Sequence, residues 1–258
     1  MIIVQYTKRF IKFLLAILYA AVLIFSSKKG HKIIVFYHGV TAKENKGFQK
    51  QLSFIADHYR VLSVSELLSK EQRDGENLCA ITFDDAFENL LENALPFLKD
   101  KKMPATIFVP AGNIGRTPGW DIGSECMDKS ENIMTMDQLK TTREAGFDLQ
   151  SHTMTHPRLA ECNDNKLRTE LFESKAQLEN LLNNRVSMIS YPHGSCSETV
   201  FSVARNAGYD FGFTIRPETV KKECNPLAIP RVGVSPLDGM IVLSLKLMGA
   251  YGYTQLKR

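Results

Sequence analysis

The chain has few cysteines, and none of them lies close to another. The five residues are 28 to 47 positions apart, and no Cys-x-x-Cys pair occurs in the 258 residues; they are Cys79, Cys126, Cys162, Cys196 and Cys224. This spacing excludes a zinc ribbon, and the odd, scattered set argues against a disulfide framework. We expect unpaired thiols, which indicate no particular redox compartment.

Acidic residues are missing from the first 32 positions, which hold six of the 32 Lys and Arg residues. The other 226 residues carry 26 basic and 28 acidic side chains and are nearly neutral. The net charge of +4 therefore comes from the N-terminal segment. A balanced remainder lacks the basic surface that nucleic acids require, so we expect no nucleic-acid partner.

A full membrane-spanning run is also missing from this basic segment. Its apolar stretch, residues 13–25, has 13 residues with cations on both sides. A spanning helix needs about 20 apolar residues and a signal peptide about 7 to 15, so length leaves a membrane anchor, an interfacial helix and a cleaved signal open. Small residues spaced as Ala-x-Ala do not follow Phe25, which favours retention. We expect residues 1–30 to form an N-terminal hydrophobic helix that attaches the protein to a membrane; the alternative is a secreted or periplasmic protein after cleavage.

Linkers, repeats and low-complexity segments are absent after residue 30, which predicts one domain over 31–240 and a short apolar and basic tail over 241–258. Strand and helix patterns alternate within this domain. We expect strands at 32–40, 59–64, 78–85, 104–110, 147–153, 186–192 and 209–215, and helices at 48–59, 63–70, 86–101, 136–146, 164–184 and 197–208. Such alternation is typical of a parallel α/β sheet or barrel, whose working face lies at the carboxyl ends of the strands.

Two adjacent carboxylates, Asp84 and Asp85, end one of the expected strands. They repel each other unless a cation or hydrogen bonds compensate them. His152 and His156 follow another strand, and Pro157 disfavours a helix there, so we expect a turn in which both imidazoles converge. Two imidazoles and one carboxylate make a three-ligand site for Zn²⁺ or a related divalent ion, which leaves the other aspartate free to act as general base.

These residues resemble the motifs of the polysaccharide deacetylases with the NodB homology domain, over roughly residues 31–235. TFDD (82–85) is similar to the first motif of that family, which implies Asp84 as base and Asp85 as metal ligand. HTMTHP (152–157) is similar to the second motif, which implies His152 and His156 as the other ligands. The implied cofactor is a divalent metal, first of all Zn²⁺, although Co²⁺ and Ni²⁺ suit the same ligands.

The resemblance also implies a fold and an activity. The fold is an α/β, NodB-like distorted (β/α) barrel with parallel strands. The activity is hydrolysis of N-acetyl groups on amino sugars of a glycan or glycoconjugate. It would proceed by attack of water on the acetamide carbonyl.

A third motif and a late arginine extend the likeness. SYPHG (190–194) resembles the motif that lines the groove wall in this family, with Ser190 in place of the usual Arg. It implies substrate contacts from four residues, with the backbone N–H of His193 helping to bind the oxyanion; these residues are Tyr191, Pro192, His193 and Gly194. The branch of the family with a YHGV first strand is the nearer likeness, since it matches FYHGVT (36–41) and IPRVGV (229–234). This match implies that Arg231 replaces the lost Arg as the partner of Asp84.

One family feature is absent, because no histidine follows His193 to serve as the general acid. A water relay, His38, or Asp84 returning its proton could fill that role, and we expect Asp84. His38 and Trp120 are further candidates for the substrate pocket; the alternatives are a hydrogen-bonded histidine at the strand end for His38 and a packing role for Trp120. Two other classes stay open: a non-catalytic glycan-binding protein of the same fold, and a metal-dependent amidohydrolase acting on a small non-sugar amide. The sequence specifies no oligomeric state.

Overall fold

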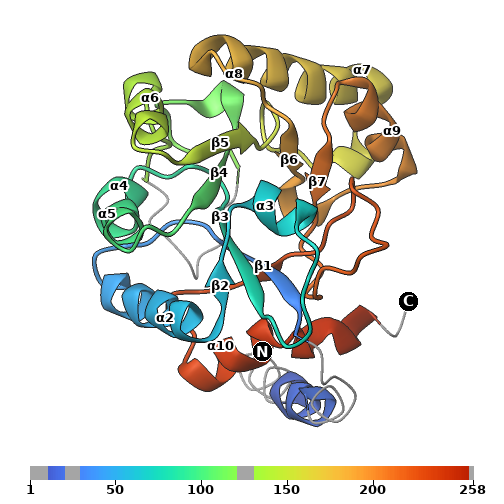
Figure 1. Ribbon diagram of the computed structural model, residues 1–258. Helices are drawn as coiled ribbons and strands as arrows, with labels where there is room; N and C mark the ends of the chain where they lie inside the picture. The colour runs from blue at the N-terminus through green and yellow to red at the C-terminus, as the bar shows by residue number, and fades with distance from the viewer. Residues whose placement is uncertain (1–10, 21–29, 121–130, 256–258) are drawn as a thin grey trace.

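A single curled sheet of parallel strands organises the chain (Figure 1). The computed structural model describes residues 11–20, 30–120 and 131–255. The strand order is β7-β6-β5-β4-β3-β1-β8, and β2 pairs with β3. The strands are β1 (Lys32–Tyr37), β2 (Arg60–Val61), β3 (Leu78–Phe83), β4 (Ala105–Val109), β5 (Asp148–Ser151), β6 (Met188–Ser190), β7 (Phe211–Phe213) and β8 (Val232–Gly233). The expected parallel α/β architecture is confirmed.

Helices cover the outside of the sheet (Figure 1). They are α2 (Asn45–His58), α3 (Val64–Ser69), α4 (Leu90–Asn93), α5 (Leu95–Asp100), α6 (Met136–Glu144), α7 (Asp164–Arg168), α8 (Ser174–Leu182), α9 (Glu198–Asn206) and α10 (Met240–Leu247). A π-helical turn, Thr169–Glu173, joins α7 to α8. The single helix expected at 86–101 is wrong, because the chain first turns after β3 and then forms two short helices. Proline lacks the N–H that a continuous helix would need, so Pro96 lies in the first turn of α5 and not in an extension of α4.

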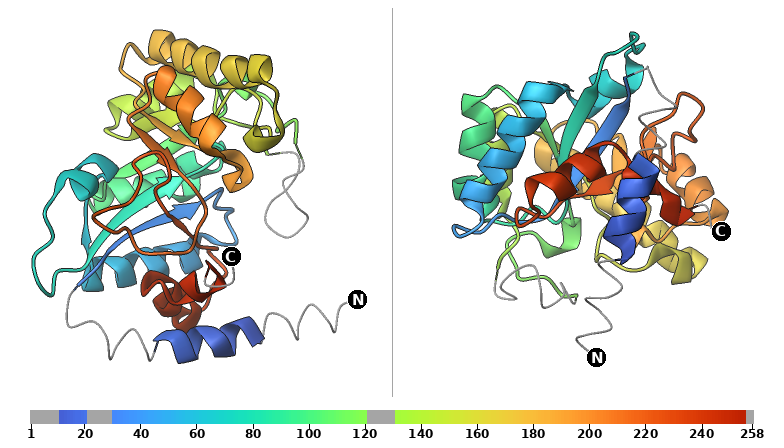
Figure 2. Two further views of the ribbon diagram at one scale, coloured as in Figure 1. Left: turned by 90° about the vertical axis from the view of Figure 1, so that its right-hand side faces the viewer. Right: turned by 90° about the horizontal axis from the view of Figure 1, so that it is seen from below.

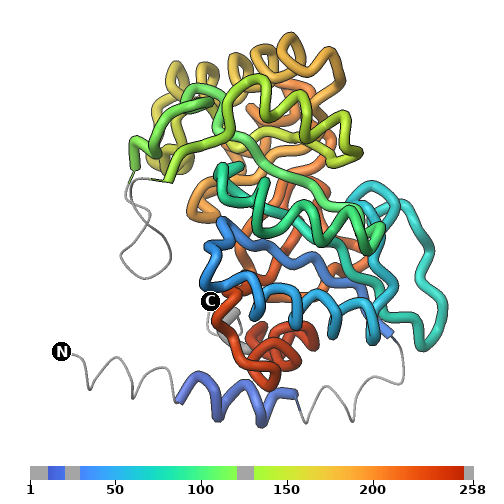
Figure 3. Tube along the Cα trace, turned by 90° about the vertical axis from the view of Figure 1, so that its left-hand side faces the viewer, coloured from blue at the N-terminus to red at the C-terminus, as the bar shows by residue number. Residues whose placement is uncertain are grey.

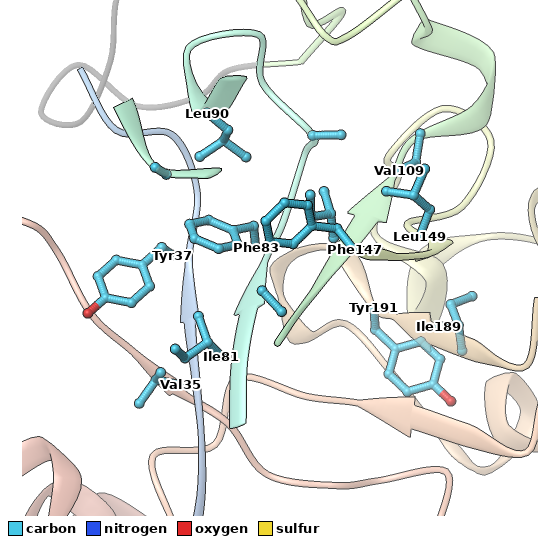
Figure 4. Packing of buried hydrophobic residues seen from close by; sticks show 14 of the residues in the cluster. Val35, Tyr37, Ile81, Phe83, Leu90, Val109, Phe147, Leu149, Ile189 and Tyr191 are labelled. Atoms are coloured by element: carbon cyan, nitrogen blue, oxygen red, sulfur yellow. The ribbon is translucent and has the colours of Figure 1, made fainter. Parts of the chain in front are cut away.

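The central strands β3 and β4 are apolar apart from Thr82 and Thr106, because both of their faces are covered. Every residue of β3 and β4 is buried. In the main core Tyr37 and Phe83 pair across β1 and β3, and their ring centroids are 5.8 Å apart (Figure 4).

The register brings the carboxyl ends of several strands to one level. Tyr37 pairs with Phe83, Val109 with Ser151, and Ser190 with Phe213, and in each pair both residues end their strands. Residues that directly follow these strands therefore meet at one rim of the sheet.

A late segment spans the gap between the two edges of the curled sheet. Ile229 forms a parallel bridge with Phe213 of β7, and four residues later Gly233 pairs with Phe36 of β1. The residues between them cross the interior, and Arg231 among them is completely buried.

The two ends of the described chain pack together. Residues 11–20 are helical, and Ala16 and Ala20 contact a cluster that includes Leu245 and Ala250 (Figures 2 and 3). Most of the expected N-terminal helix, residues 1–10 and 21–29, lies outside the described residues. Among the residues that the structure covers, no helix is long and apolar enough to cross a membrane.

The expected tail over 241–258 starts inside α10. This helix places Leu243 and Leu247 in the main core, and its partner β8 lies against β1. The segment up to residue 247 therefore packs with the domain, and residues 256–258 lie outside the described part.

Candidate active site

Three buried side chains, Asp85, His152 and His156, converge at the carboxyl rim of the sheet. Their candidate ligand atoms all lie within 4.8 Å of one another. The Nε2 atoms of both imidazoles are 3.4 Å from the same oxygen, Oδ1 of Asp85. The convergence expected from the Asp-Asp and His-x-x-x-His patterns is present.

The backbone that carries these side chains is unusual. Asp85 is the second residue after β3 and has a φ of 70°, and the turn after β5 has φ values of 68° at Thr153 and 59° at His156. Residues with side chains rarely adopt this left-handed region, and such strain concentrates at functional sites. The turn conformation, rather than a helix, brings the two imidazoles together.

A hydrogen bond assigns the tautomer of one imidazole. Nδ1 of His152 lies 2.8 Å from the carbonyl oxygen of Ser190, which only accepts, so Nδ1 carries the proton. Burial lowers the pKa of His152 to about 4, so its ring is neutral and Nε2 presents a lone pair to Asp85. Burial, together with the neighbouring imidazoles, lowers the pKa of His156 to about 2.

These groups fit a divalent cation. Oδ1 of Asp85 is buried and accepts no hydrogen bond, and Nδ1 of His156 is buried without a partner as well. Burial and the charge of Asp84 raise the pKa of Asp85, because both disfavour its charged form. A bound cation would favour that charged form. One carboxylate and two imidazoles with open positions match the ligand sets of catalytic zinc sites.

The second aspartate is held by Arg231. Nη1 and Nη2 of Arg231 donate to Oδ1 and Oδ2 of Asp84, each at 2.8 Å. Burial opposes ionisation of Asp84, but the guanidinium outweighs it and holds the pKa of this carboxyl well below its usual range. Asp84 is therefore a charged acceptor beside the three converging side chains.

Arg231 is itself enclosed on all sides. Its guanidinium donates to Thr82 Oγ1, Ser190 Oγ and the carbonyl oxygen of Thr214. Three aromatic rings surround it at 4.7 to 5.8 Å from the guanidinium carbon; they are Phe36, Phe108 and Phe213. A planar, weakly hydrated guanidinium suits such a site better than an ammonium would.

The residues expected to contact substrate take different positions. Tyr191 is fully buried beside Ile189, and its hydroxyl donates to the carbonyl oxygen of Leu227 (Figure 4). The side chain of Tyr191 therefore belongs to the core, and only its backbone could line a substrate groove. Pro192 is also buried, whereas the His193 ring is exposed and lies 4.8 Å from the His156 ring, edge to face.

His38 and Trp120 flank the site. His38 follows β1 and is exposed, with its ring 5.6 Å from that of Phe36. Trp120 is partly buried and stacks on His156 at 4.1 Å between centroids. The indole thus covers one face of a candidate metal ligand, a contact that the sequence did not predict.

Two site residues were missed from the sequence. Ser190 donates to Asp84 and accepts from Arg231, so it helps to connect the pair. Glu170 is completely buried and accepts hydrogen bonds from the turn between the two histidines. Glu170 lies on the buried face of an expected helix that also holds Asp164, Glu173 and Glu179, so its sequence alone did not distinguish it from exposed acids.

Comparison with known proteins identifies relatives over most of the chain. The family model described as polysaccharide deacetylase matches residues 71–212. YxkH of Bacillus subtilis, named as a polysaccharide deacetylase, is 27% identical over 212 residues, which are 79% of this chain and 71% of that protein. The poly-β-1,6-N-acetyl-D-glucosamine N-deacetylase of Staphylococcus aureus (strain MRSA252) is 26% identical over 73% of this chain and 66% of its own length.

Solved structures show the same fold. The Streptococcus pyogenes deacetylase PplD, in complex with acetate, superposes with a TM-score of 0.70 at 24% identity, over 85% of this chain and 99% of that one. IcaB from Ammonifex degensii gives a TM-score of 0.68 at 19% identity, over 87% and 98% of the two chains. The family model covers more than half of the sequence, so the chain belongs to the polysaccharide deacetylase family, hydrolases that act on carbon–nitrogen bonds of non-peptide amides.

Proposed function

We propose that this protein is a metal-dependent deacetylase that removes N-acetyl groups from amino sugars of a glycan or glycoconjugate. The observation that carries the proposal is the pairing of two sites at one rim. One is the group of metal-binding type, Asp85, His152 and His156; the other is the charged pair of Asp84 and Arg231.

Asp85, His152 and His156 would hold the ion, with Zn²⁺ proposed first and Co²⁺ or Ni²⁺ as alternatives. A bound divalent ion supplies Lewis-acid chemistry, because it lowers the pKa of water and polarises a carbonyl. The protein contributes rigidity, since the Nδ1 hydrogen bond of His152 fixes the ring that would bind.

Asp84 is proposed as the general base. It would accept a proton from water as the water oxygen bonds to the acetyl carbon. It would return that proton to the nitrogen as the C–N bond breaks, so that acetate and a free amine leave. Arg231 would keep this carboxylate ionised and oriented, and the backbone N–H of His193 would donate to the developing oxyanion.

The substrate class is proposed from the family and one relative. A poly-β-1,6-N-acetyl-D-glucosamine deacetylase is 26% identical to this chain, so β-1,6-linked N-acetylglucosamine oligomers are the first substrates to test. His38, Trp120, His193 and Gly194 would contact the sugar around the rim.

Two rival functions make different predictions. A glycan-binding protein without activity would bind the oligomers and release no acetate, but it would have no use for a buried group of metal-binding type beside the charged carboxylate of Asp84. An amidohydrolase for small amides would act on N-acetylated monomers or non-sugar amides and not prefer oligomers.

The proposed function is tested by acetate release from N-acetylglucosamine oligomers with and without a chelator. We expect release that stops with the chelator and returns on adding Zn²⁺ or Co²⁺. Oligomer binding without any release in the metal-loaded protein would favour the binding class instead.

We also propose that the N-terminal segment attaches the protein to a membrane surface. Helix 11–20 leaves Ile11, Leu14 and Leu18 between 43% and 65% exposed, while Ala16 is buried against the C-terminal cluster. The surrounding sequence is basic and has no acid up to residue 32, which suits an anionic lipid surface. Sedimentation with anionic vesicles tests this attachment.

A further inference from the structure

Glu170 is a buried carboxylate that the proposed chemistry does not use. It lies in the π-helical turn Thr169–Glu173, and it is fully shielded from solvent. A buried charge is tolerated only where hydrogen bonds and opposite charge compensate it. The groups that compensate Glu170 therefore indicate its role.

Both oxygens of Glu170 are engaged, and most of their donors come from one short turn. Oε2 accepts from the backbone N–H groups of Met154 and Thr155, each at 2.8 Å. Oε1 accepts from the Thr155 hydroxyl and pairs with Nζ of Lys166 at 2.8 Å. Met154 and Thr155 lie between His152 and His156, so the carboxylate binds the loop that joins two candidate ligands.

That loop needs an outside partner because its own backbone is strained. Thr153 and His156 have φ values of 68° and 59°, in the left-handed region. Inside the loop, the N–H of His156 donates to Thr153 Oγ1 at 3.1 Å and the N–H of Thr153 to Ser151 Oγ at 3.2 Å. These bonds leave the two central N–H groups pointing toward one oxygen, an arrangement that favours an anion.

The π-helical turn brings the carboxylate to this place. Such turns insert one residue into a helix and are common at functional sites. Ser174, at the start of α8, donates to the carbonyl oxygen of Glu170 at 2.6 Å and lies 3.2 Å from Ser151 Oγ. Ser174 therefore links this helix to the end of β5, and the Glu170 side chain links it to the loop that follows.

We propose that Glu170 is a positioning residue, whose charged side chain holds the 152–156 loop in the conformation in which His152 and His156 face Asp85. The effect on metal affinity rests on the proposed function, whereas the effect on the loop does not. Residues that orient metal ligands through hydrogen bonds typically contribute about 10- to 100-fold to metal affinity, and we expect a loss in that range for Glu170→Gln.

The test uses Glu170→Gln with Glu173→Gln as its matched control, because Glu173 lies in the same turn and is exposed. Two quantities are measured in the full chain: Zn²⁺ affinity by competition with a chelator, and hydrogen exchange of the Met154 and Thr155 amides without metal. We expect Glu170→Gln to weaken Zn²⁺ binding about 10- to 100-fold and to speed exchange of both amides, and Glu173→Gln to change neither. A folded Glu170→Gln protein with the affinity and amide protection of the parent would overturn the proposal.

Two further variants keep the outcomes separate. If Glu170→Gln does not fold, Thr155→Val removes one bond to Oε1 and leaves the carboxylate in place, so faster exchange and weaker binding are still expected; unchanged values would overturn the proposal. His152→Ala tests the metal site itself. If His152→Ala binds Zn²⁺ as tightly as the parent does, the proposed metal site is wrong. Amide exchange in Glu170→Gln would still show whether the Glu170 carboxylate holds the loop.

Discussion

Arg231 and Asp84 face each other through two parallel hydrogen bonds of 2.8 Å, although 147 residues separate them in the sequence. Both side chains are buried, so neither charge can be compensated by water. Each is therefore the main partner of the other, and the pair connects the late 229–233 segment to the end of β3. This dependence gives the first prediction.

Replacing Arg231 should lower the free energy of unfolding. Arg231→Ala leaves the Asp84 charge buried without its partner, which typically costs about 3–5 kcal/mol in the free energy of unfolding. Arg231→Lys keeps the charge but loses the planar two-point contact, so we expect a smaller loss. Denaturant unfolding measures both changes.

Arg185 provides the control, because it pairs with Asp210 at 2.9 Å on the surface, where the two side chains are 67% and 46% exposed. We expect Arg185→Ala to change the unfolding free energy by about 0–1 kcal/mol. Equal effects at positions 185 and 231 would contradict the proposed dependence of Asp84 on Arg231.

Substitutions of Asp84 and Asp85 should affect metal binding and rate differently. Asp84→Asn removes the proposed base and leaves Asp85 with both histidines in place, so we expect bound metal to be retained and the rate to fall about 100-fold or more. Asp85→Asn replaces a charged ligand with a neutral amide, so metal should be lost first and activity with it. Metal content and acetate release are measured on the same samples; loss of metal from Asp84→Asn alone would reverse the assignment.

Single histidine changes should remove the metal and leave the fold intact. We expect His152→Ala and His156→Ala to lose stoichiometric Zn²⁺, because each leaves two ligands of three. His58 provides the control, since it is exposed on α2 and its ring contacts Phe54 in its own helix. Full metal occupancy in either site variant would rule out this ligand set.

Much of the site was predictable because its residues directly follow strands. The strand before Asp84 and the strand before His152 could both be recognised from apolar runs, and parallel strands bring their carboxyl ends to one rim. The pairing of Arg231 with Asp84 came from resemblance to a family branch. No local pattern predicts that contact, since it depends on a segment crossing between β7 and β1.

The failures have physical causes too. A helix was expected at 86–101 from the spacing of its apolar residues. That spacing gives no sign of the left-handed backbone at Asp85 and Ala86, which turns the chain before any helix begins. Tyr191 was expected at the substrate groove, yet an aromatic ring at a strand end can point to either face, and this one fills the core. Glu170 was missed because the donors that tie it to the loop include two backbone N–H groups, which have no signature in the sequence.

The last prediction concerns helix 11–20, where neighbouring positions have opposite environments. Leu18 is 65% exposed, whereas Ala16 is completely buried in the cluster with Leu245. Leu18→Glu should weaken binding to anionic vesicles, because it places a charge where the apolar face would enter the lipid interface, and it should leave thermal unfolding unchanged. Ala16→Glu instead introduces a charge between this helix and the C-terminal segment, so we expect the helix to detach from α10 and its amides to exchange faster. Vesicle sedimentation and hydrogen exchange on both full-length variants measure these effects. Unchanged vesicle binding by Leu18→Glu would show that this face does not bind lipid, whatever the behaviour of Ala16→Glu.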